Sequence, residues 1–141
     1  MTRVVLDASV LLSAAVGRPE SPPSVLLDAV RSGEIDMVAC ERLLAEVRDG
    51  LATRYFRGRL TEEERAAFPP MLGALAVLLE DPTCPPPILR DPDDDYLVAL
   101  ARVANATAII TGDRDLLDHD GLEPPAHNAR QGCVVLGLID P

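Results

Sequence analysis

Val4-Val5-Leu6-Asp7 is a short apolar run that ends in a carboxylate. A second such run, Ala108-Ile109-Ile110, leads into Thr111-Gly112-Asp113-Arg114-Asp115. Both runs predict buried strands, and ligands bind beyond the carboxyl ends of strands in an open parallel sheet. Acids that follow two strands can therefore meet in one crevice, where a cation relieves their repulsion of about 4 kcal/mol per pair at about 4 Å. Oxygen-only clusters favour Mg²⁺ or Mn²⁺, so the two runs predict a divalent metal site.

Length and composition predict a single domain. A chain of 141 residues with 48% hydrophobic content can build one core and is too short for two comfortable ones. No apolar run approaches the roughly 18 residues of a membrane span, and Asp7 interrupts the run that could otherwise pass for a signal peptide. Cys40, Cys84 and Cys133 are odd in number and widely spaced, which favours reduced, buried thiols over a disulfide or zinc site. We therefore expect one cytoplasmic domain over residues 1–141.

The charge of the chain limits its chemistry. A formal net charge of −10 argues against a polyanionic partner, but a metal would neutralise several acids and one face can still be basic. All 13 basic residues are arginines. The lack of lysine in the sequence excludes Walker-type phosphate binding, Schiff-base chemistry and the lysine of haloacid-dehalogenase-like phosphohydrolases and response-regulator receivers.

Apolar periodicity and capping signals predict alternating strands and helices. We expect strands over residues 3–7, 35–39 and 108–110, and helices over 9–16, from Pro22 to an end at Gly33, over 41–51 and over 91–104. A capping box at Thr61 and Glu64 opens a further helix, which Pro69-Pro70 interrupts and which resumes through Leu79. Residues 82–87 form a stiff, proline-rich connector. The alternation predicts a parallel sheet flanked by helices.

The C-terminal residues carry signals for two structures. Asn128 and Gln131 form a capping box for a final helix through Cys133 and Ile139. Val134-Val135-Leu136 also suits a short strand. We favour the helix.

Two acids on the first half of the chain have a structural explanation beside a functional one. An unpaired charge inside an apolar run is costly, so the position of Asp7 favours a function. Glu46 lies at the border of the apolar stripe of its helix, about 115° from the centre. A solvated role and a functional role fit Glu46 equally, whereas Asp49 falls on the solvated face.

The acids of the second half also allow two interpretations. In Asp91-Pro92-Asp93-Asp94-Asp95 capping and the helix dipole need fewer acids than are present, so at least one is left for another role. Asp113 and Asp115 either belong to a site or cap a short helix that begins at Arg114.

Taken in order, these segments resemble the PIN domain. The matching segments are Asp7-Ala8-Ser9-Val10-Leu11, Glu46 on its helix, Asp95-Tyr96-Leu97-Val98-Ala99-Leu100-Ala101 and Thr111-Gly112-Asp113-Arg114-Asp115-Leu116. More narrowly, the run Arg90–Asp95 followed by the Thr-Gly-Asp-x-Asp element is similar to the PIN-family toxins of bacterial toxin–antitoxin pairs. The resemblance spans about residues 3 to 122. It implies a three-layer α/β/α fold around a central parallel sheet.

The resemblance implies a metal-dependent nuclease of single-stranded RNA. It assigns one or two Mg²⁺ or Mn²⁺ ions to four acids, which are Asp7, Glu46, Asp95 and Asp113. Asp115 matches a further acid, which binds directly or through water. Ser9 and Thr111 are expected to hydrogen-bond the carboxylates. Water activated by the metal would attack a phosphodiester.

The chain departs from the family near its C-terminus. Where relatives carry an apolar strand, this chain has Pro124-Pro125-Ala126-His127-Asn128, so we expect that strand to be frayed or missing. His119 and His127 fit no catalytic spacing, and we expect them on the surface or in loops.

Arg54, Arg57 and Arg59 form the densest basic stretch, with aromatic residues between them. They would contact the RNA backbone or help to stack a base. A solvated helix end and contact with an antitoxin segment are the two alternatives.

We therefore expect an Mg²⁺- or Mn²⁺-dependent endoribonuclease that acts as the toxin of a toxin–antitoxin pair. Its expected partners are RNA, a cognate antitoxin protein and a second copy in a homodimer, without a membrane. The alternatives are a non-catalytic PIN-like binding module, an RNA-processing nuclease outside any toxin–antitoxin pair, and a phosphohydrolase of small esters. The lack of lysine disfavours the last.

Overall fold

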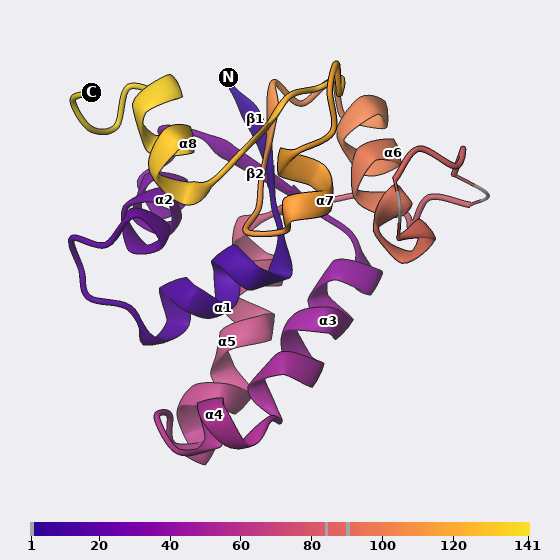
Figure 1. Ribbon diagram of the computed structural model, residues 1–141. Helices are drawn as coiled ribbons and strands as arrows, with labels where there is room; N and C mark the ends of the chain where they lie inside the picture. Colours follow the sequence, from indigo (N-terminus) through magenta and orange to yellow (C-terminus); the bar gives the residue numbers. More distant parts are fainter. Residues whose placement is uncertain (1, 84, 90) are drawn as a thin grey trace.

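The computed structural model describes residues 2–83, 85–89 and 91–141, and within them a sheet of five parallel strands forms the centre of the molecule (Figure 1). The strands lie in the order β3-β2-β1-β4-β5. Their bounds are β1 Arg3–Leu6, β2 Asp36–Ala39, β3 Val77–Leu78, β4 Ala108–Ile110 and β5 Ala126–His127. The central strand β1 pairs Val4 with Met37 of β2 and with Ala108 of β4. The two predicted apolar runs are therefore neighbouring strands that end at the same edge of the sheet.

Helices cover both faces of this sheet. On one face α6 (Asp95–Val103) contacts β1, β2 and β4. On the other side α8 (Ala129–Val135) contacts β4 and β5 and packs against α2 (Pro22–Arg31), as Figure 1 shows. Gly132 allows α8 to approach β4 closely, because a Cβ at this position would lie 2.7 Å from Ile110 Cδ1. The predicted α/β fold with a central parallel sheet is confirmed.

Three helices form an arm that extends away from the sheet (Figure 1). α3 (Glu41–Leu51) packs against α1 (Ala8–Val16), α4 (Arg54–Arg57) and α5 (Glu62–Leu75). The first turn of α3 lies nearest the sheet, and α4 lies at the far end of the arm (Figure 1). The arm thus carries Glu46 close to the sheet and the arginines of α4 far from it.

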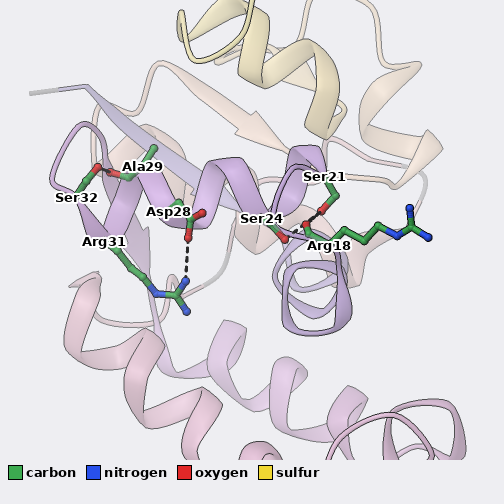
Figure 2. Close-up of polar contacts among 7 residues, drawn as sticks. All are labelled: Arg18, Ser21, Ser24, Asp28, Ala29, Arg31 and Ser32. Atoms are coloured by element: carbon green, nitrogen blue, oxygen red, sulfur yellow. Dashed lines mark hydrogen bonds and ion pairs between the residues drawn. The ribbon is translucent and has the colours of Figure 1, made fainter.

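Polar contacts close both ends of α2 (Figure 2). At its start the Ser21 hydroxyl donates to the Arg18 carbonyl at 2.8 Å, and Pro22 occupies the first turn, as predicted. At its end Arg31 donates to Asp28 at 3.0 Å. Both partners of this ion pair are largely exposed, so it adds little to stability. These contacts define the helix that supports α8.

The core is formed by the strands and the helix faces that cover them. Val4, Val5 and Ile109 are fully buried, as expected for the two apolar runs. Cys40 and Cys133 are buried and free, as predicted, whereas Cys84 lies outside the described residues, as does Arg90 of the acidic run. None of the helices in the described ranges combines the length and apolar character needed to cross a bilayer.

The predicted helix break at Pro69-Pro70 is wrong. α5 continues from Glu62 to Leu75 through both prolines. Each proline lacks the N–H group that would donate within the helix. Leu72, which follows them, is fully buried, and α5 packs along α3. Packing therefore outweighs the hydrogen bonds that the prolines remove.

The predicted continuation of this helix through Leu79 is also wrong. The backbone is extended at Ala76, with φ −80° and ψ 154°. Val77 and Leu78 then pair with Val38 and Ala39 of β2 to form the edge strand β3. Backbone hydrogen bonds to β2 override a spacing of apolar residues that also suits a helix.

The C-terminal region agrees with the predicted helix but not with the expected loss of a strand. Asn128 and Gln131 form the capping box of α8, which ends at Val135 rather than Ile139. The strand expected to be frayed or missing is present as β5, where Ala126 pairs with Ile109 and His127 with Ile110. A strand needs backbone partners more than apolar side chains, and Pro125 supplies a carbonyl to the Ile109 N–H at 3.0 Å.

Candidate functional site

Asp7 begins the site at the carboxyl end of β1. Its N–H donates to the Ile110 carbonyl at 2.9 Å, which joins the ends of β1 and β4. Its side chain caps α1, because Oδ1 accepts from the Ala8 N–H at 2.7 Å. Oδ2 accepts from the Thr111 hydroxyl at 2.6 Å. Both carboxylate oxygens are thus held in place by the fold.

Thr111 connects the ends of the two strands. It is fully buried, and its hydroxyl donates to Asp7 while accepting from the Asp113 N–H at 3.0 Å. Asp113 caps α7 (Arg114–Leu117) through Oδ1, which accepts from the Asp115 N–H at 2.9 Å. Of the two alternatives for Asp113, the structure shows the cap, and the site role remains a prediction. Ser9 instead accepts from the Gly112 N–H at 3.3 Å and so fixes the backbone of this loop.

Glu46 reaches the same edge from the middle of α3. It is half-buried, whereas Asp49 on the next turn is exposed, as predicted. The phenol O–H of Tyr96, which lies in α6, donates to Glu46 Oε1. Burial raises the pKa of Glu46, the charge of Asp7 raises it further, and Arg42 lowers it. Glu46, which the sequence places at the border of the apolar stripe of α3, thus lies near Asp7.

The acidic run before α6 divides between two roles. Asp91 caps a short 3₁₀-helix, η1 (Pro92–Asp94), by accepting from the Asp93 N–H at 3.0 Å. Asp95 is 2% exposed, and its Oδ1 accepts from the N–H groups of Ile88 and Leu89 at 3.1 and 2.8 Å. That carboxylate fixes the loop before η1.

Asp94, in the same run, lies beside Asp7 and Asp113. Burial, a hydrogen bond with the Asp113 side chain and the charges of Asp113 and Asp7 together raise its pKa to about 7. The resemblance to the PIN domain selects Asp95 from this run and leaves out Asp94. Neighbouring side chains on a helix point about 100° apart. Which acid of the run faces the site therefore depends on how η1 is placed. The assignment of Asp95 remains a prediction.

The four carboxylates of Asp7, Glu46, Asp94 and Asp113 form one electrostatic cluster. Burial raises the pKa of Asp7, hydrogen bonds from Thr111 and Ala8 lower it, and the charge of Asp113 raises it again. Three of the four acids therefore hold their protons more tightly than an isolated carboxyl group does. Such a cluster gains a great deal from a cation, which replaces shared protons and removes the repulsion.

The donor set fits a hard divalent cation. All four side chains offer carboxylate oxygens, which Mg²⁺ and Mn²⁺ prefer. In the part of the chain that the structure describes, no three acidic, histidine or cysteine side chains lie close enough together to form a metal site without rearrangement. The fit is therefore one of donor chemistry and charge, and side chains would have to move closer around an ion.

The remaining predicted residues lie in different places. Asp115 is half-buried in the first turn of α7, two residues after Asp113. Arg54, Arg57 and Arg59 are exposed at α4, at the far end of the arm (Figure 1). The Arg59 guanidinium lies 3.6 Å from the ring centroid of Tyr55, which is 52% exposed. They form a basic, aromatic surface separated from Glu46 by the second half of α3.

The two histidines are outside the carboxylate cluster. His119 is exposed after α7, and His127 is half-buried in β5. Neither histidine has a catalytic spacing in the sequence. Neither is among the groups that shift the pKa of Asp7, Glu46 or Asp94.

Comparisons with known proteins found similarity to one family and to solved structures. Residues 3–115 match the PIN domain family. The structure resembles the crystal structure of PAE2754 from Pyrobaculum aerophilum with a TM-score of 0.66, over 98% of this chain and 91% of that chain, at 17% sequence identity. That likeness concerns the fold alone. None of the curated proteins matches the chain.

Proposed function

The chain belongs to the PIN domain family, and from this membership we propose that it is a metal-dependent endoribonuclease that cuts single-stranded RNA in the cytoplasm. PIN domains are generally nucleases, and therefore hydrolases. The observation that carries the proposal is the convergence of Asp7, Glu46, Asp94 and Asp113 at the carboxyl edge of β1 and β4. Burial and the neighbouring charges raise the pKa of Asp7, Glu46 and Asp94. A bound cation would stabilise the ionised form of all three.

The proposed roles follow from the contacts of each acid. Asp7 and Asp113, both connected to Thr111, form the rigid side of the site. Glu46 and Asp94 approach from α3 and η1 and complete it. When bound, one or two Mg²⁺ or Mn²⁺ ions would activate water for attack on a phosphodiester and neutralise the charge that develops on the phosphate. Asp95 holds the 88–89 loop, and Asp115 supports Asp113 through its N–H group.

The arm supplies the proposed surface for RNA. Its exposed arginines, Arg54, Arg57 and Arg59, concentrate positive charge in a protein of net charge −10. The Tyr55 ring beside them can stack on a base. Substrate RNA would lie along α3 between these arginines and the carboxylates.

The direct test is cleavage of a labelled single-stranded RNA in Mn²⁺ or Mg²⁺. We expect the parent protein to cut, and Asp7→Asn to lose activity while its circular dichroism is unchanged. Asp28→Asn makes the same chemical change at an exposed acid of α2 and should cut like the parent. Full cleavage by Asp7→Asn, or none by the parent with either metal, would show that the domain is not this enzyme. Cleavage of a chromogenic phosphate monoester instead of RNA would favour a phosphohydrolase.

We propose further that the enzyme is the toxin of a toxin–antitoxin pair. The support is the resemblance of the Arg90–Asp95 run and the Thr-Gly-Asp-x-Asp element to such toxins. A groove of about 520 Å³ between α3 and α5, with Leu44, Leu51, Pro69 and Pro70 among its lining residues, offers an apolar surface to an antitoxin. Growth arrest on expression, relieved by the product of a small neighbouring gene, is the expected result. Equal arrest by Asp7→Asn would refute a toxin that acts by RNA cleavage.

A further inference from the structure

Tyr96 is a buried aromatic residue whose hydroxyl reaches the candidate site. Its side chain is fully buried in α6, and its phenol O–H donates to Glu46 Oε1 on α3. A buried tyrosine hydroxyl requires a hydrogen-bond partner. Many groups could serve as that partner, yet here it is one of the four carboxylates of the site. This contact links the core of the protein directly to Glu46.

From this contact we infer that Tyr96 is a positioning residue, which holds Glu46 in the orientation that receives a divalent cation. The inference rests on the proposed function, because it assigns a task within the same site. Glutamate has three rotatable side-chain bonds, and fixing them costs free energy when a ligand binds. A donor that already restricts Glu46 removes part of that cost from the binding step, even though the carboxylates still have to move closer around an ion. The phenol engages one carboxylate oxygen and leaves the other for a ligand.

Arg42 strengthens this arrangement from the same face of α3. It precedes Glu46 by four residues, so the two side chains are neighbours on the helix. The Arg42 guanidinium lies 4.2 Å from the ring centroid of Tyr96, and its Nη2 donates to the Asp93 carbonyl at 2.8 Å. Asp93 lies in η1, directly before Asp94. α3 and the η1–α6 segment are therefore joined by two hydrogen bonds, from Arg42 to Asp93 and from Tyr96 to Glu46, and by the packing of Arg42 on the Tyr96 ring.

The two contacts fix the relation between Glu46 and Asp94, which approach the cluster from different elements. The Arg42 N–H also donates to Asp81 Oδ1 at 2.9 Å, so the loop after β3 holds the start of α3 as well. Of these contacts the one from Tyr96 ends on a carboxylate of the site. Removing the phenol oxygen should thus affect metal binding while the ring stays buried under Arg42.

The test is Mn²⁺ affinity at one fixed pH, measured by calorimetry and by the dependence of the melting temperature on Mn²⁺ concentration. Tyr96→Phe should bind Mn²⁺ roughly 10- to 100-fold more weakly than the parent, as expected when a residue that orients a metal ligand is lost. Thr107→Val is the matched control, because it also deletes one bonded hydroxyl, which donates to the Arg3 carbonyl at 3.2 Å, at the opposite edge of the sheet. It should bind like the parent.

A double-mutant cycle distinguishes positioning from a general loss of structure. If Tyr96 acts through Glu46, adding Tyr96→Phe to Glu46→Ala should change Mn²⁺ affinity by less than about twofold. A parent-like affinity of Tyr96→Phe overturns the inference, and so does a further tenfold loss in the Glu46→Ala background. RNA cleavage is scored separately. If the parent binds Mn²⁺ but does not cut RNA, the proposed ribonuclease function is refuted and the role of Tyr96 in metal binding is not. If the parent cuts RNA and Tyr96→Phe binds Mn²⁺ like the parent, only the inference about Tyr96 is refuted.

Discussion

Asp113 follows β4 and yet raises the pKa of Asp94, which lies before α6. The next residue, Asp95, points to backbone N–H groups of its own loop. Adjacent acids in one run therefore have different partners, Asp113 for Asp94 and backbone N–H groups for Asp95.

The first prediction compares Asp94→Ala with Asp95→Ala. Asp94→Ala should weaken Mn²⁺ binding and slow RNA cleavage by tenfold or more, roughly the effect of disturbing a metal shell, with little loss of stability. Asp95→Ala should lower the free energy of unfolding by about 2 kcal/mol or more, because two backbone N–H groups lose their acceptor in a buried position. Urea unfolding and Mn²⁺ titration of both variants give the answer. The reverse pattern would return Asp95 to the metal site and exclude Asp94.

The second prediction concerns pH in the absence of metal. The pKa of Asp94 is raised to about 7 in the folded state, and burial also raises the pKa of Asp7 and of Glu46. The folded protein therefore retains protons that the unfolded chain releases, so the stabilisation is complete below about pH 4 and is lost as the pH rises towards 7. The melting temperature in EDTA should fall between pH 5 and pH 8. Asp94→Asn, which mimics the protonated acid, should show a smaller fall, and an identical profile would show that Asp94 is not the source of the pH dependence.

The third prediction is that divalent metal stabilises the folded protein. A ligand that binds the native state alone adds about 2.7 kcal/mol at a hundredfold excess over its Kd. Mn²⁺ or Mg²⁺ should thus raise the melting temperature, most strongly near pH 8, where the carboxylates are ionised. NaCl at the same ionic strength should have a much smaller effect. Equal effects of both salts would indicate general screening in place of a specific site.

The fourth prediction is that the arm binds RNA without taking part in the chemical step. Changing Arg54, Arg57 and Arg59 to Gln should raise KM and reduce the salt dependence of binding, which is about −0.7 in slope per neutralised phosphate on single strands. Single-turnover cleavage at saturating RNA should stay near the parent rate.

The control for this prediction removes the same three charges elsewhere. Arg18, Arg31 and Arg130 are exposed and lie outside the arm, so their change to Gln should leave the salt dependence unchanged. If both triple variants lose affinity equally, net charge rather than the arm explains binding. If neither does, contact with a protein partner is the better role for α4.

Local signals in the sequence predicted much of the fold correctly. The apolar runs of β1 and β4 and the capping boxes of α5 and α8 each depend on residues a few positions apart. β3 depends instead on pairing with β2, and α5 continues through Pro69-Pro70 because it packs on α3. Neither of these partners is visible in the local pattern. The surroundings of Asp95 likewise depend on the loop at Ile88 and Leu89, whose N–H groups donate to it.

The hydrogen bond from Thr111 to Asp7 joins residues that are 104 positions apart in the chain. The two halves of the rigid side of the site are therefore made at different times during protein synthesis. Contacts between such distant positions form late, after the chain between them has been made and ordered. A nascent chain that still lacks β4 has Asp7 but neither Thr111 nor Asp113. The proposed nuclease would therefore stay inactive until residues 108–113 have been made and have folded beside β1.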